Sequence, residues 1–456
     1  MPENKKQLVL DSIMNKTVAR TPWVPFVGCH AGALIGVDAE TYGKNADCIV
    51  KGVLNAIEEY KPDGIPVAFD LQLEAEILRC ELKFAKDNPP SVTSHPLAEG
   101  LKLKDLYYNV PDDSRLAEVL RATKEISAKA GNDVALYGLV TGPFTLALHL
   151  MGTDIFYDIA DEPDYVKEVL AFCEQVCIKT AGLYLDSGVD IIALVDPMTS
   201  QISPDHFEEF VTPYAKRIFE YVRNRGKLSS FFVCGHARRN VEKMCECGPD
   251  NISIDENIPL DYVKAVGEKY GVSIGGNIKL TLTLLFGSPT DAIRDAENCM
   301  SIGGNKGFIL APGCDVPYAT PKENIKAISS LIHGEVTQFL SSGNALDGID
   351  YELPDYANEK QVIIDVITLD SASCAPCQYT MEAVYAACDG FGDAVKVIEH
   401  KIKEKESVVC MLKIGAAYIP TIVIDGKIKY ESIIPEVPVL REDIVQAVAV
   451  KKNHAI

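Results

Sequence analysis

The chain has 456 residues and is therefore longer than one ordinary domain. This length predicts two or three domains, unless one of them is a large barrel. Its formal net charge of -21 gives an acidic surface, which excludes nucleic acid and anionic membranes as main partners, and no apolar run approaches the ~20 residues that cross a bilayer. Fourteen cysteines behind a polar start without a secretory signal predict a reducing, cytoplasmic location, where clustered thiols usually serve metal or redox chemistry.

An amphipathic helical pattern over residues 2–15 opens the chain. Eight apolar runs bounded by turn residues follow and predict strands: 23–27, 64–70, 134–143, 190–197, 228–235, 252–256, 272–277 and 307–313. Helical patterns, several of them opened by proline, lie between these runs: 114–129, 163–186, 204–225, 259–269 and 289–302.

Apolar strands that alternate with long helices are typical of a parallel sheet covered by helices. The pattern therefore predicts an α/β fold over residues 1–335, a (β/α)8 TIM-type barrel with an N-terminal helical extension. A doubly wound open sheet is the alternative, because a strand count from one sequence varies by one or two.

Polar and thiol residues stand where the predicted strands end: Cys29, His30, Asp70, Asp196, Cys234, His236, Asp255, Glu256, Asn277 and Cys314. An isolated acidic residue at such a place is usually a helix cap. Barrel enzymes, however, carry their catalytic groups at the carboxyl ends of the strands, and so many together predict a catalytic mouth.

Cys234 and Cys314 end two different predicted strands, and each lies next to a glycine. A free cysteine is most often a small apolar core residue, but a place at a strand end favours a soft metal site. Zinc prefers thiolate and imidazole, and a catalytic zinc site has about three protein ligands and one open position. His236, two residues after Cys234 on the same side of an extended chain, is the predicted third ligand. His30, Asp196, Asp255 and Glu256 are the alternatives.

Residues 336–359 predict a linker, and residues 360–456 predict a small second domain. Its elements are a strand at 361–368, a helix at 378–388, a strand at 394–400, a helix at 408–414, a hairpin at 418–428 with an Asp-Gly turn, and a last helix at 441–451.

Cys374-x-x-Cys377 lies at the first strand-to-helix junction of this domain. A helix N-terminus favours the thiolate, so Cys374 is the predicted nucleophile and Cys377 the resolving thiol. Half a zinc knuckle is the alternative, but no second cysteine pair stands at the usual spacing. Ile419-Pro420-Thr421 resembles the cis-proline loop that faces the dithiol of thioredoxins. Together these features predict a thioredoxin-like α/β domain.

Further motifs lie between Arg20 and about Leu331. They are Phe69-Asp70-Leu71-x-x-Glu74-Ala75-Glu76, Cys80-Glu81-x-Lys83-Phe84, Gly142-Pro143-Phe144-Thr145-Leu146-Ala147, Asp196-Pro197-x-x-Ser200-x-Ile202-Ser203-Pro204, Cys234-Gly235, Ser253-Ile254-Asp255-Glu256, Gly275-Gly276-Asn277 and Leu310-Ala311-Pro312-Gly313-Cys314-Asp315. In this order they resemble the uroporphyrinogen decarboxylase-like corrinoid methyltransferases, which include methylcobalamin:coenzyme M methyltransferases. In those enzymes a His-x-Cys pair and a distant Cys hold zinc. Cys234 and Cys314 match the two cysteines, and Phe232 stands where the histidine is expected.

The resemblance implies zinc-dependent methyl transfer between a corrinoid, as free methylcobalamin or on a corrinoid protein, and a small thiol or other methyl acceptor or donor. Asp255 and Glu256 would be catalytic. Asp70, Asp196, Asn277 and, in the dithiol domain, Pro420 would contact substrate. Either His236 or a carboxylate replaces the missing histidine, or the site has lost zinc.

The alternative function is a thiol-disulfide oxidoreductase, acting on a redox partner, whose barrel binds a corrinoid or tetrapyrrole. Decarboxylation of a porphyrinogen is disfavoured, because the arginine-rich N-terminal signature is absent from the stretch Trp23-Val24-Pro25-Phe26-Val27-Gly28-Cys29-His30.

Overall fold

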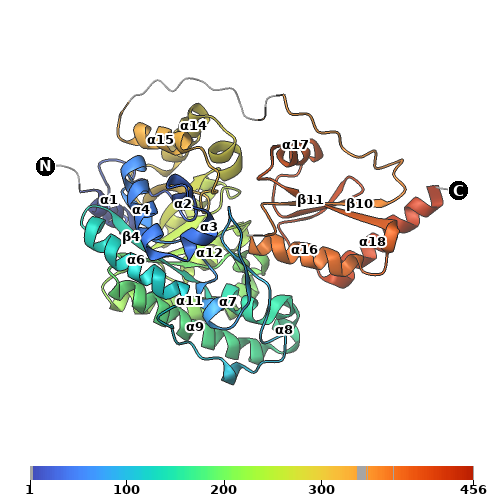
Figure 1. The fold of residues 1–456 in the computed structure, drawn as a ribbon, viewed down its shortest axis with the longest axis horizontal. Coiled ribbons are helices and arrows are strands. Elements are labelled where there is room, and N and C mark those ends of the chain that lie inside the picture. The colour runs from blue at the N-terminus through green and yellow to red at the C-terminus, as the bar shows by residue number, and fades with distance from the viewer. Residues whose placement is uncertain (1–3, 336–345, 347, 373, 455–456) are drawn as a thin grey trace. The chain divides into compact units, whose positions relative to one another are not determined.

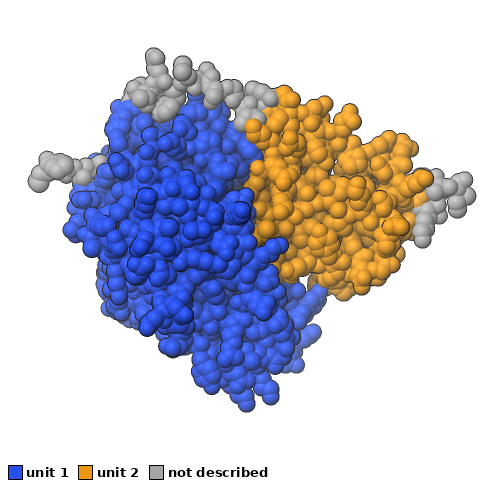
Figure 2. Space-filling model, viewed as in Figure 1, with its two compact units in different colours: residues 1–342 blue, residues 343–456 orange. Residues whose placement is uncertain are grey.

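The computed structural model describes residues 4–335, 346, 348–372 and 374–454. The chain forms two compact units, residues 1–342 and 343–456 (Figures 1 and 2). Of the predicted linker, 336–359, the positions 336–345 and 347 lie outside the described residues. The predicted domain boundaries remain predictions.

The first unit is built on one curled parallel sheet of seven strands. The strands are β1 (Gly64–Pro66), β4 (Ala135–Thr141), β5 (Ile191–Val195), β6 (Leu228–Val233), β7 (Asn251–Ile254), β8 (Ser273–Ile278) and β9 (Phe308–Pro312), in this spatial order. Each strand pairs in parallel with the next. Nearly every residue of these strands is buried, as expected of a sheet covered on both faces. The predicted α/β class and parallel sheet are confirmed.

The eighth predicted strand, 23–27, is wrong as a full strand, since it forms a single parallel bridge from Trp23 to Leu310. Nevertheless this segment lies between the two edge strands. The Val24 amide donates to the Leu310 carbonyl at 3.0 Å, and the Asp63 amide donates to the Trp23 carbonyl at 2.9 Å. The Asp63 carboxylate accepts the Trp23 amide at 2.8 Å and binds Arg20. This junction, the barrel seam (residues 22–24), links β9 to β1.

Helices surround this sheet in Figure 1. The longer ones are α4 (Ala46–Tyr60), α6 (Arg115–Ala130), α7 (Pro143–Met151), α9 (Pro163–Asp186), α11 (Thr212–Asn224), α13 (Leu260–Tyr270), α14 (Pro289–Gly303) and α15 (Lys322–Ile332). The shorter ones are α2 (His30–Leu34), α3 (Ala39–Gly43), α5 (Leu73–Ile77), α8 (Ile155–Asp161), α10 (Pro204–Phe210) and α12 (Val241–Glu246), and α1 (Lys5–Ile13) precedes the sheet.

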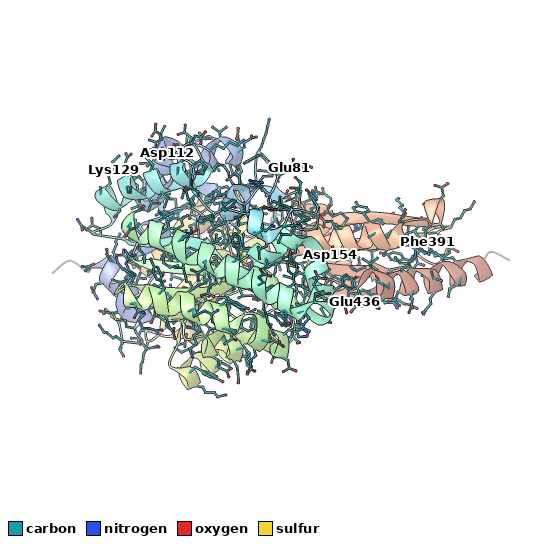
Figure 3. The ribbon with its side chains drawn as sticks, turned by 90° about the horizontal axis from the view of Figure 1, so that it is seen from below. Glu81, Asp112, Lys129, Asp154, Phe391 and Glu436 are labelled. Carbon is teal, nitrogen blue, oxygen red and sulfur yellow. A yellow bond between two sulfur atoms is a disulfide. The ribbon has the colours of Figure 1, made fainter. Side chains whose placement is uncertain are left out.

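Local sequence explains where several helices begin. Proline occupies the first turn of α7, α9, α10 and α14, where its missing amide costs no hydrogen bond. Ser288 and Asp291 form a capping box at α14. Charged side chains cover the outward faces, such as Lys129 in the last turn of α6, which is exposed and paired with Glu125 (Figure 3).

Alternate residues of the strands fill the interior of the curled sheet. One buried cluster contains Tyr137 and Leu139 of β4, Ile191, Ala193 and Val195 of β5, Phe232 of β6, and Ile309 and Ala311 of β9, with Phe26 and Phe69. Because side chains alternate along a strand, the next inward position of β6 after Phe232 is Cys234. Cys234 and Cys314 indeed pack against this cluster.

The second unit contains a four-stranded sheet in the order β11-β10-β12-β13. The strands are β10 (Val362–Thr368), β11 (Val395–Lys401), β12 (Thr421–Ile424) and β13 (Lys427–Glu431), and the helices are α16 (Ala375–Cys388), α17 (Lys405–Ile414) and α18 (Val437–His454). β10 and β11 are parallel, whereas β12 runs antiparallel to both β10 and β13. None of the described helices is both long and apolar enough to cross a membrane.

Candidate functional site at the carboxyl ends of the barrel strands

Two sulfur atoms meet at the carboxyl ends of the barrel strands. Cys234 follows β6 and Cys314 follows β9, two strands that are not neighbours in the sheet, and their Sγ atoms lie 2.7 Å apart. Both residues are only partly buried. The contact with Cys314, followed by burial, raises the pKa of the Cys234 thiol well above its ordinary value. The structure thus brings together the two predicted thiol ligands.

Zinc ligation by His236 beside these two thiols stays a prediction. Within the described residues, no group of three or more His, Cys, Asp and Glu side chains is arranged to hold a metal ion. The reason lies in the backbone, because β6 ends at Val233 and Gly235 has a φ of +81°, so the chain is no longer extended at His236. His236 instead lies near enough to Asp255 to lower the pKa of that carboxyl electrostatically.

Phe232 belongs to the apolar cluster against which Cys234 and Cys314 pack. Its ring centroid lies 5.1 Å from that of Phe26 and 5.9 Å from that of Phe69, the second pair edge to face. Its neighbour Phe231 points outward instead, toward Phe207 and Phe219 of the helices. The position where the resemblance expects a histidine is therefore an inward one next to the thiols, but its side chain cannot bind a metal.

Asp255 and Asn277, predicted at the mouth, hold its backbone in place. The Asp255 carboxylate accepts the Gly235 amide at 2.9 Å and the Asn257 amide at 2.9 Å. The Asn277 side chain donates to the Asp255 and Ile258 carbonyls. Burial raises the pKa of Asp255, against the effect of these hydrogen bonds. These bonds fix the turns that follow β6 and β7.

Glu256 is a predicted mouth residue whose carboxyl group has a raised pKa. One of its carboxylate oxygens accepts the Leu280 amide at 2.5 Å. Burial, reinforced by the charge of Asp255, raises the pKa of Glu256 to about 8. A carboxyl group with this pKa carries a proton at neutral pH and is able to donate it.

Asp196 and Asp70 serve other parts of the same face. Asp196 is fully buried and accepts the Thr145 amide at 2.7 Å and the Thr145 hydroxyl at 2.6 Å, so it caps α7. Burial raises its pKa to about 6. Asp70 forms an ion pair with the buried Arg115, whose guanidinium also binds Glu76. Substrate contacts for Asp70, Asp196 and Asn277 remain predictions.

Sequence reasoning missed two buried polar groups on this side of the barrel. Arg115 is one, and its Nη2 atom has no hydrogen-bond partner although it is buried. Glu74 is the other, a buried carboxyl that accepts the Thr141 hydroxyl at 2.9 Å. Burial raises the pKa of Glu74 to about 7. Glu74 was visible only as part of a motif, and Arg115 lies on a helix whose pattern gives no sign of burial.

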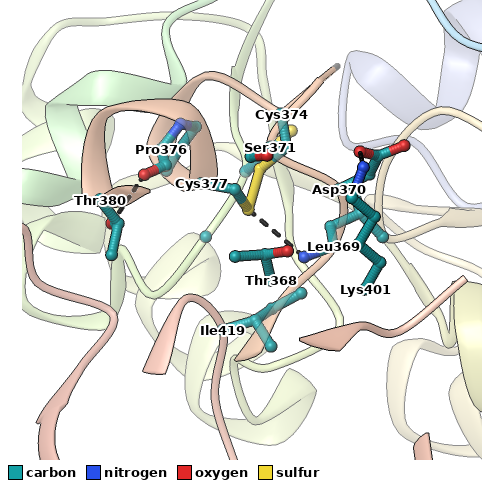
Figure 4. The surroundings of a disulfide bond; sticks show 12 residues. Thr368, Leu369, Asp370, Ser371, Cys374, Pro376, Cys377, Thr380, Lys401 and Ile419 are labelled. Carbon is teal, nitrogen blue, oxygen red and sulfur yellow. Dashed lines mark hydrogen bonds and ion pairs between the residues drawn. A yellow bond between two sulfur atoms is a disulfide. The ribbon is translucent and has the colours of Figure 1, made fainter. Parts of the chain in front are cut away.

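The second unit carries its own sulfur pair. Cys374 and Cys377 form a disulfide at the N-terminus of α16, surrounded by the end of β10 and by the loop before β12 that holds Ile419 (Figure 4). Cys374 is partly exposed, whereas Cys377 is fully buried and accepts the Leu369 amide at 3.4 Å. The Ile419–Pro420 peptide bond is cis, as predicted.

The first unit resembles known proteins in sequence and in structure. Residues 4–334 match the profile of the family described as Uroporphyrinogen decarboxylase (URO-D). The methylcobamide:CoM methyltransferase MtaA of Methanosarcina barkeri is 30% identical over 282 residues, 60% of this chain and 81% of that protein. A uroporphyrinogen decarboxylase of Wolbachia pipientis is 26% identical over 298 residues, 63% of this chain and 84% of that protein.

Among solved structures, a methyltransferase from Methanosarcina mazei superimposes with a TM-score of 0.66 at 25% sequence identity. The superposition covers 73% of this chain and 99% of that one.

Proposed function

The chain belongs to the uroporphyrinogen decarboxylase (URO-D) family, and we propose that its first unit is a corrinoid-dependent methyltransferase. The observation that carries the proposal is the thiol pair of Cys234 and Cys314 at the carboxyl ends of the barrel strands, where barrel enzymes perform their chemistry. The names of relatives such as MtaA supply a methylcobamide as donor and CoM as acceptor. The substrates proposed here are accordingly a methylcorrinoid, free or protein-bound, and a thiol.

In this reaction the thiol sulfur bonds to the methyl carbon, the electron pair of the cobalt–carbon bond stays with cobalt, and the thiol proton is released. The residues of the chain would orient the two reactants and exclude water. Asp255 and Asn277 support this role, because they fix the turns around Cys234. The Asp255 carboxylate accepts the Gly235 and Asn257 amides, and the Asn277 side chain donates to the Asp255 backbone carbonyl. Glu256, with its raised pKa, is suited to hold a proton at the mouth.

Zinc would supply a lower pKa for the acceptor thiol, but the donor set does not fit zinc as it stands. Two zinc-bound sulfurs, each ~2.3 Å from the metal in a tetrahedron, lie about 3.8 Å apart, whereas the two Sγ atoms lie 2.7 Å apart. The described chain also brings no third ligand to the pair. Zinc bound by Cys234, Cys314 and His236 stays a prediction, and no step of the mechanism depends on it.

Methyl transfer is tested by mixing the protein with methylcobalamin and a panel of small thiols and following the corrinoid spectrum. We expect demethylation with the wild-type protein and at least a ~100-fold slower reaction with Cys234→Ser, the size of loss typical of a positioned catalytic group. Cys48→Ser, a half-buried cysteine of the same unit, is the matched control and retains the activity. Equal rates in Cys234→Ser, or no reaction with any thiol, would contradict the proposal.

We further propose that the second unit is a thioredoxin-like domain with dithiol redox activity. Its strand order, with a parallel pair followed by two antiparallel strands, and its Cys374–Cys377 disulfide at a helix N-terminus support this. In an insulin-type disulfide reduction assay Cys374→Ser is expected to abolish activity, and Cys388→Ser, at the far end of the same helix, to preserve it. Activity that survives in Cys374→Ser would refute the assignment.

A further inference from the structure

We propose that Cys234 and Cys314 form a reversible disulfide, and that this pair is a substrate of the Cys374–Cys377 dithiol. The inference deepens the proposed redox function of the second unit, on which it rests. It names a substrate for that dithiol, and it gives the thiol pair of the barrel a second chemistry besides methyl transfer.

The distance between the two sulfurs favours this chemistry. A disulfide bond measures about 2.05 Å, so the Sγ atoms, at 2.7 Å, need to approach by only about 0.7 Å to bond. To hold a tetrahedral zinc ion they would have to separate by about 1.1 Å. The pair is therefore nearer to a bonded state than to a metal-ligating one.

The surroundings also favour a neutral pair of sulfurs. Both cysteines pack against the buried cluster that contains the rings of Phe232, Phe26 and Phe69, which offer no charge and no hydrogen-bond donor to a thiolate. The Asp255 carboxylate accepts the amide of Gly235, which follows Cys234, and Asp315 directly follows Cys314, so two acidic side chains stand beside the pair and disfavour a further anion. A disulfide removes both potential charges.

Access distinguishes these sulfurs from most others. Apart from Cys48 and Cys388, the remaining free cysteines of the described chain are buried. Of the Cys374–Cys377 pair in the second unit, Cys374 is the accessible sulfur, since Cys377 is fully buried. Because the N-terminus of α16 stabilises a thiolate at Cys374, this residue is both the better nucleophile toward a disulfide and the better leaving group from a mixed one.

The exchange balances without an outside oxidant. A thiolate of the barrel pair attacks Cys374 Sγ, the bond to Cys377 breaks, and the electron pair leaves on Cys377, which takes up a proton. The second barrel thiol, losing its proton, then attacks its partner sulfur in the mixed disulfide and releases Cys374, which is protonated. Two electrons and two protons thus pass from the barrel pair to Cys374 and Cys377. The reverse sequence reduces the barrel pair.

Trapping of the mixed disulfide tests the proposal in the full-length chain. In Cys377→Ser the resolving thiol is missing, so after oxidation of the barrel pair with diamide the Cys374 thiolate attacks and remains attached. In this variant, digestion and mass spectrometry are expected to find Cys374 linked to Cys234 or Cys314. Wild-type protein treated with diamide is expected to lose two titratable thiols, because Cys234 and Cys314 become linked. A trap yield that is independent of protein concentration indicates exchange within one chain, and a yield that rises with concentration indicates exchange between copies.

Two further variants in the Cys377→Ser background serve as controls. Cys48→Ser in the Cys377→Ser background is the matched control and should trap equally well, whereas replacing both Cys234 and Cys314 by Ser in that background should abolish the trap. Three outcomes would each overturn the proposal. Cys374 stays free while the Cys234–Cys314 disulfide persists, Cys374 becomes linked equally to Cys48, or oxidised wild-type protein shows no Cys234–Cys314 link. No corrinoid is present, so these outcomes are independent of the methyl-transfer test, and the insulin assay reports separately on the dithiol.

Discussion

One side chain, Phe232, decides what the thiol pair can bind. It occupies the inward position of β6 directly below Cys234 and packs against Phe26 and Phe69. A ligand side chain at this position would reach the two sulfurs from the interior of the barrel, because residues 232 and 234 share one face of the chain.

We therefore expect Phe232→His to create a zinc site with Cys234 and Cys314. The variant should retain about one zinc per chain after dialysis, measured by inductively coupled plasma mass spectrometry, and wild-type protein much less. Phe232→Leu is the control, since it removes the ring without adding a ligand. Zinc in wild-type protein that disappears in Cys234→Ala would instead support the predicted site with His236, and equal zinc in both Phe232 variants would rule out ligation by residue 232.

At this scale the sequence predicted the thiol pair but not its surroundings. Two cysteines beside glycines at strand ends were enough to place Cys234 and Cys314 together. The prediction for His236 assumed an extended chain beyond Cys234, and the left-handed conformation of Gly235 breaks that extension. The sequence does not specify the φ angle that a glycine adopts, so the direction of the chain at His236 could not be predicted from it.

At the scale of elements, the start of α7 depends on the end of β5. The buried Asp196 carboxylate accepts the Phe144 amide, the Thr145 amide and the Thr145 hydroxyl. A Cβ atom on Gly142 would collide with the Asp196 side chain, so the glycine allows this close approach. The carboxylate thereby satisfies amides that the first turn of a helix leaves without partners.

Asp196→Ala is expected to lower the free energy of unfolding by about 2–3 kcal/mol, since it leaves buried donors of α7 unsatisfied. Chemical denaturation followed by circular dichroism measures this. Asp205→Ala, at an exposed residue in the first turn of α10, is the control and should change stability by less than about 0.5 kcal/mol. If the two variants are equally stable while Asp196→Ala alone loses activity, Asp196 contacts substrate as the sequence predicted.

Most elements were predictable because their signals are local. Continuous apolar runs predicted the seven strands, and prolines and small polar caps marked the starts of helices. The segment 23–27 carries the same apolar signal, yet Pro22 and Pro25 have no amide hydrogens to donate to a ladder, and only one bridge forms. The prolines are visible in the sequence, but an apolar pattern alone does not reveal which backbone amides must donate hydrogen bonds to a neighbouring strand.

At the scale of the whole molecule, each of the two units has its own hydrophobic core. In the second unit His400 is buried, and its Nε2 lies 2.8 Å from the Asp365 carboxylate. Burial alone would lower the pKa of His400, but hydrogen bonds to Asp365 and Cys410 outweigh it and raise the pKa to about 9. A raised histidine pKa contributes stability that is complete below the unfolded value of 6.5 and is lost as the pH rises through about 9.

Raising the pH from 6.5 to 9 should therefore destabilise the second unit by up to about 3 kcal/mol. Hydrogen exchange followed by mass spectrometry, corrected for the intrinsic rate at each pH, measures this in peptides of β10 and β11. His400→Gln should remove this pH dependence, and peptides of β5 in the first unit serve as an internal reference. A protection that is constant across this range in wild-type protein would contradict the raised pKa.

The barrel seam sets an order of events during synthesis. Trp23 leaves the ribosome early and can bond to the edge next to β1, but its bridge partner Leu310 belongs to the last strand of the barrel. The N-terminal segment therefore waits for almost the whole first unit before it can pair with β9. A nascent chain that stops short of β9 keeps the outer edge of β8 without its strand partner, and open edges invite pairing with other chains. A few backbone hydrogen bonds at residues 22–24 thus make completion of the barrel a late event in the life of each new molecule.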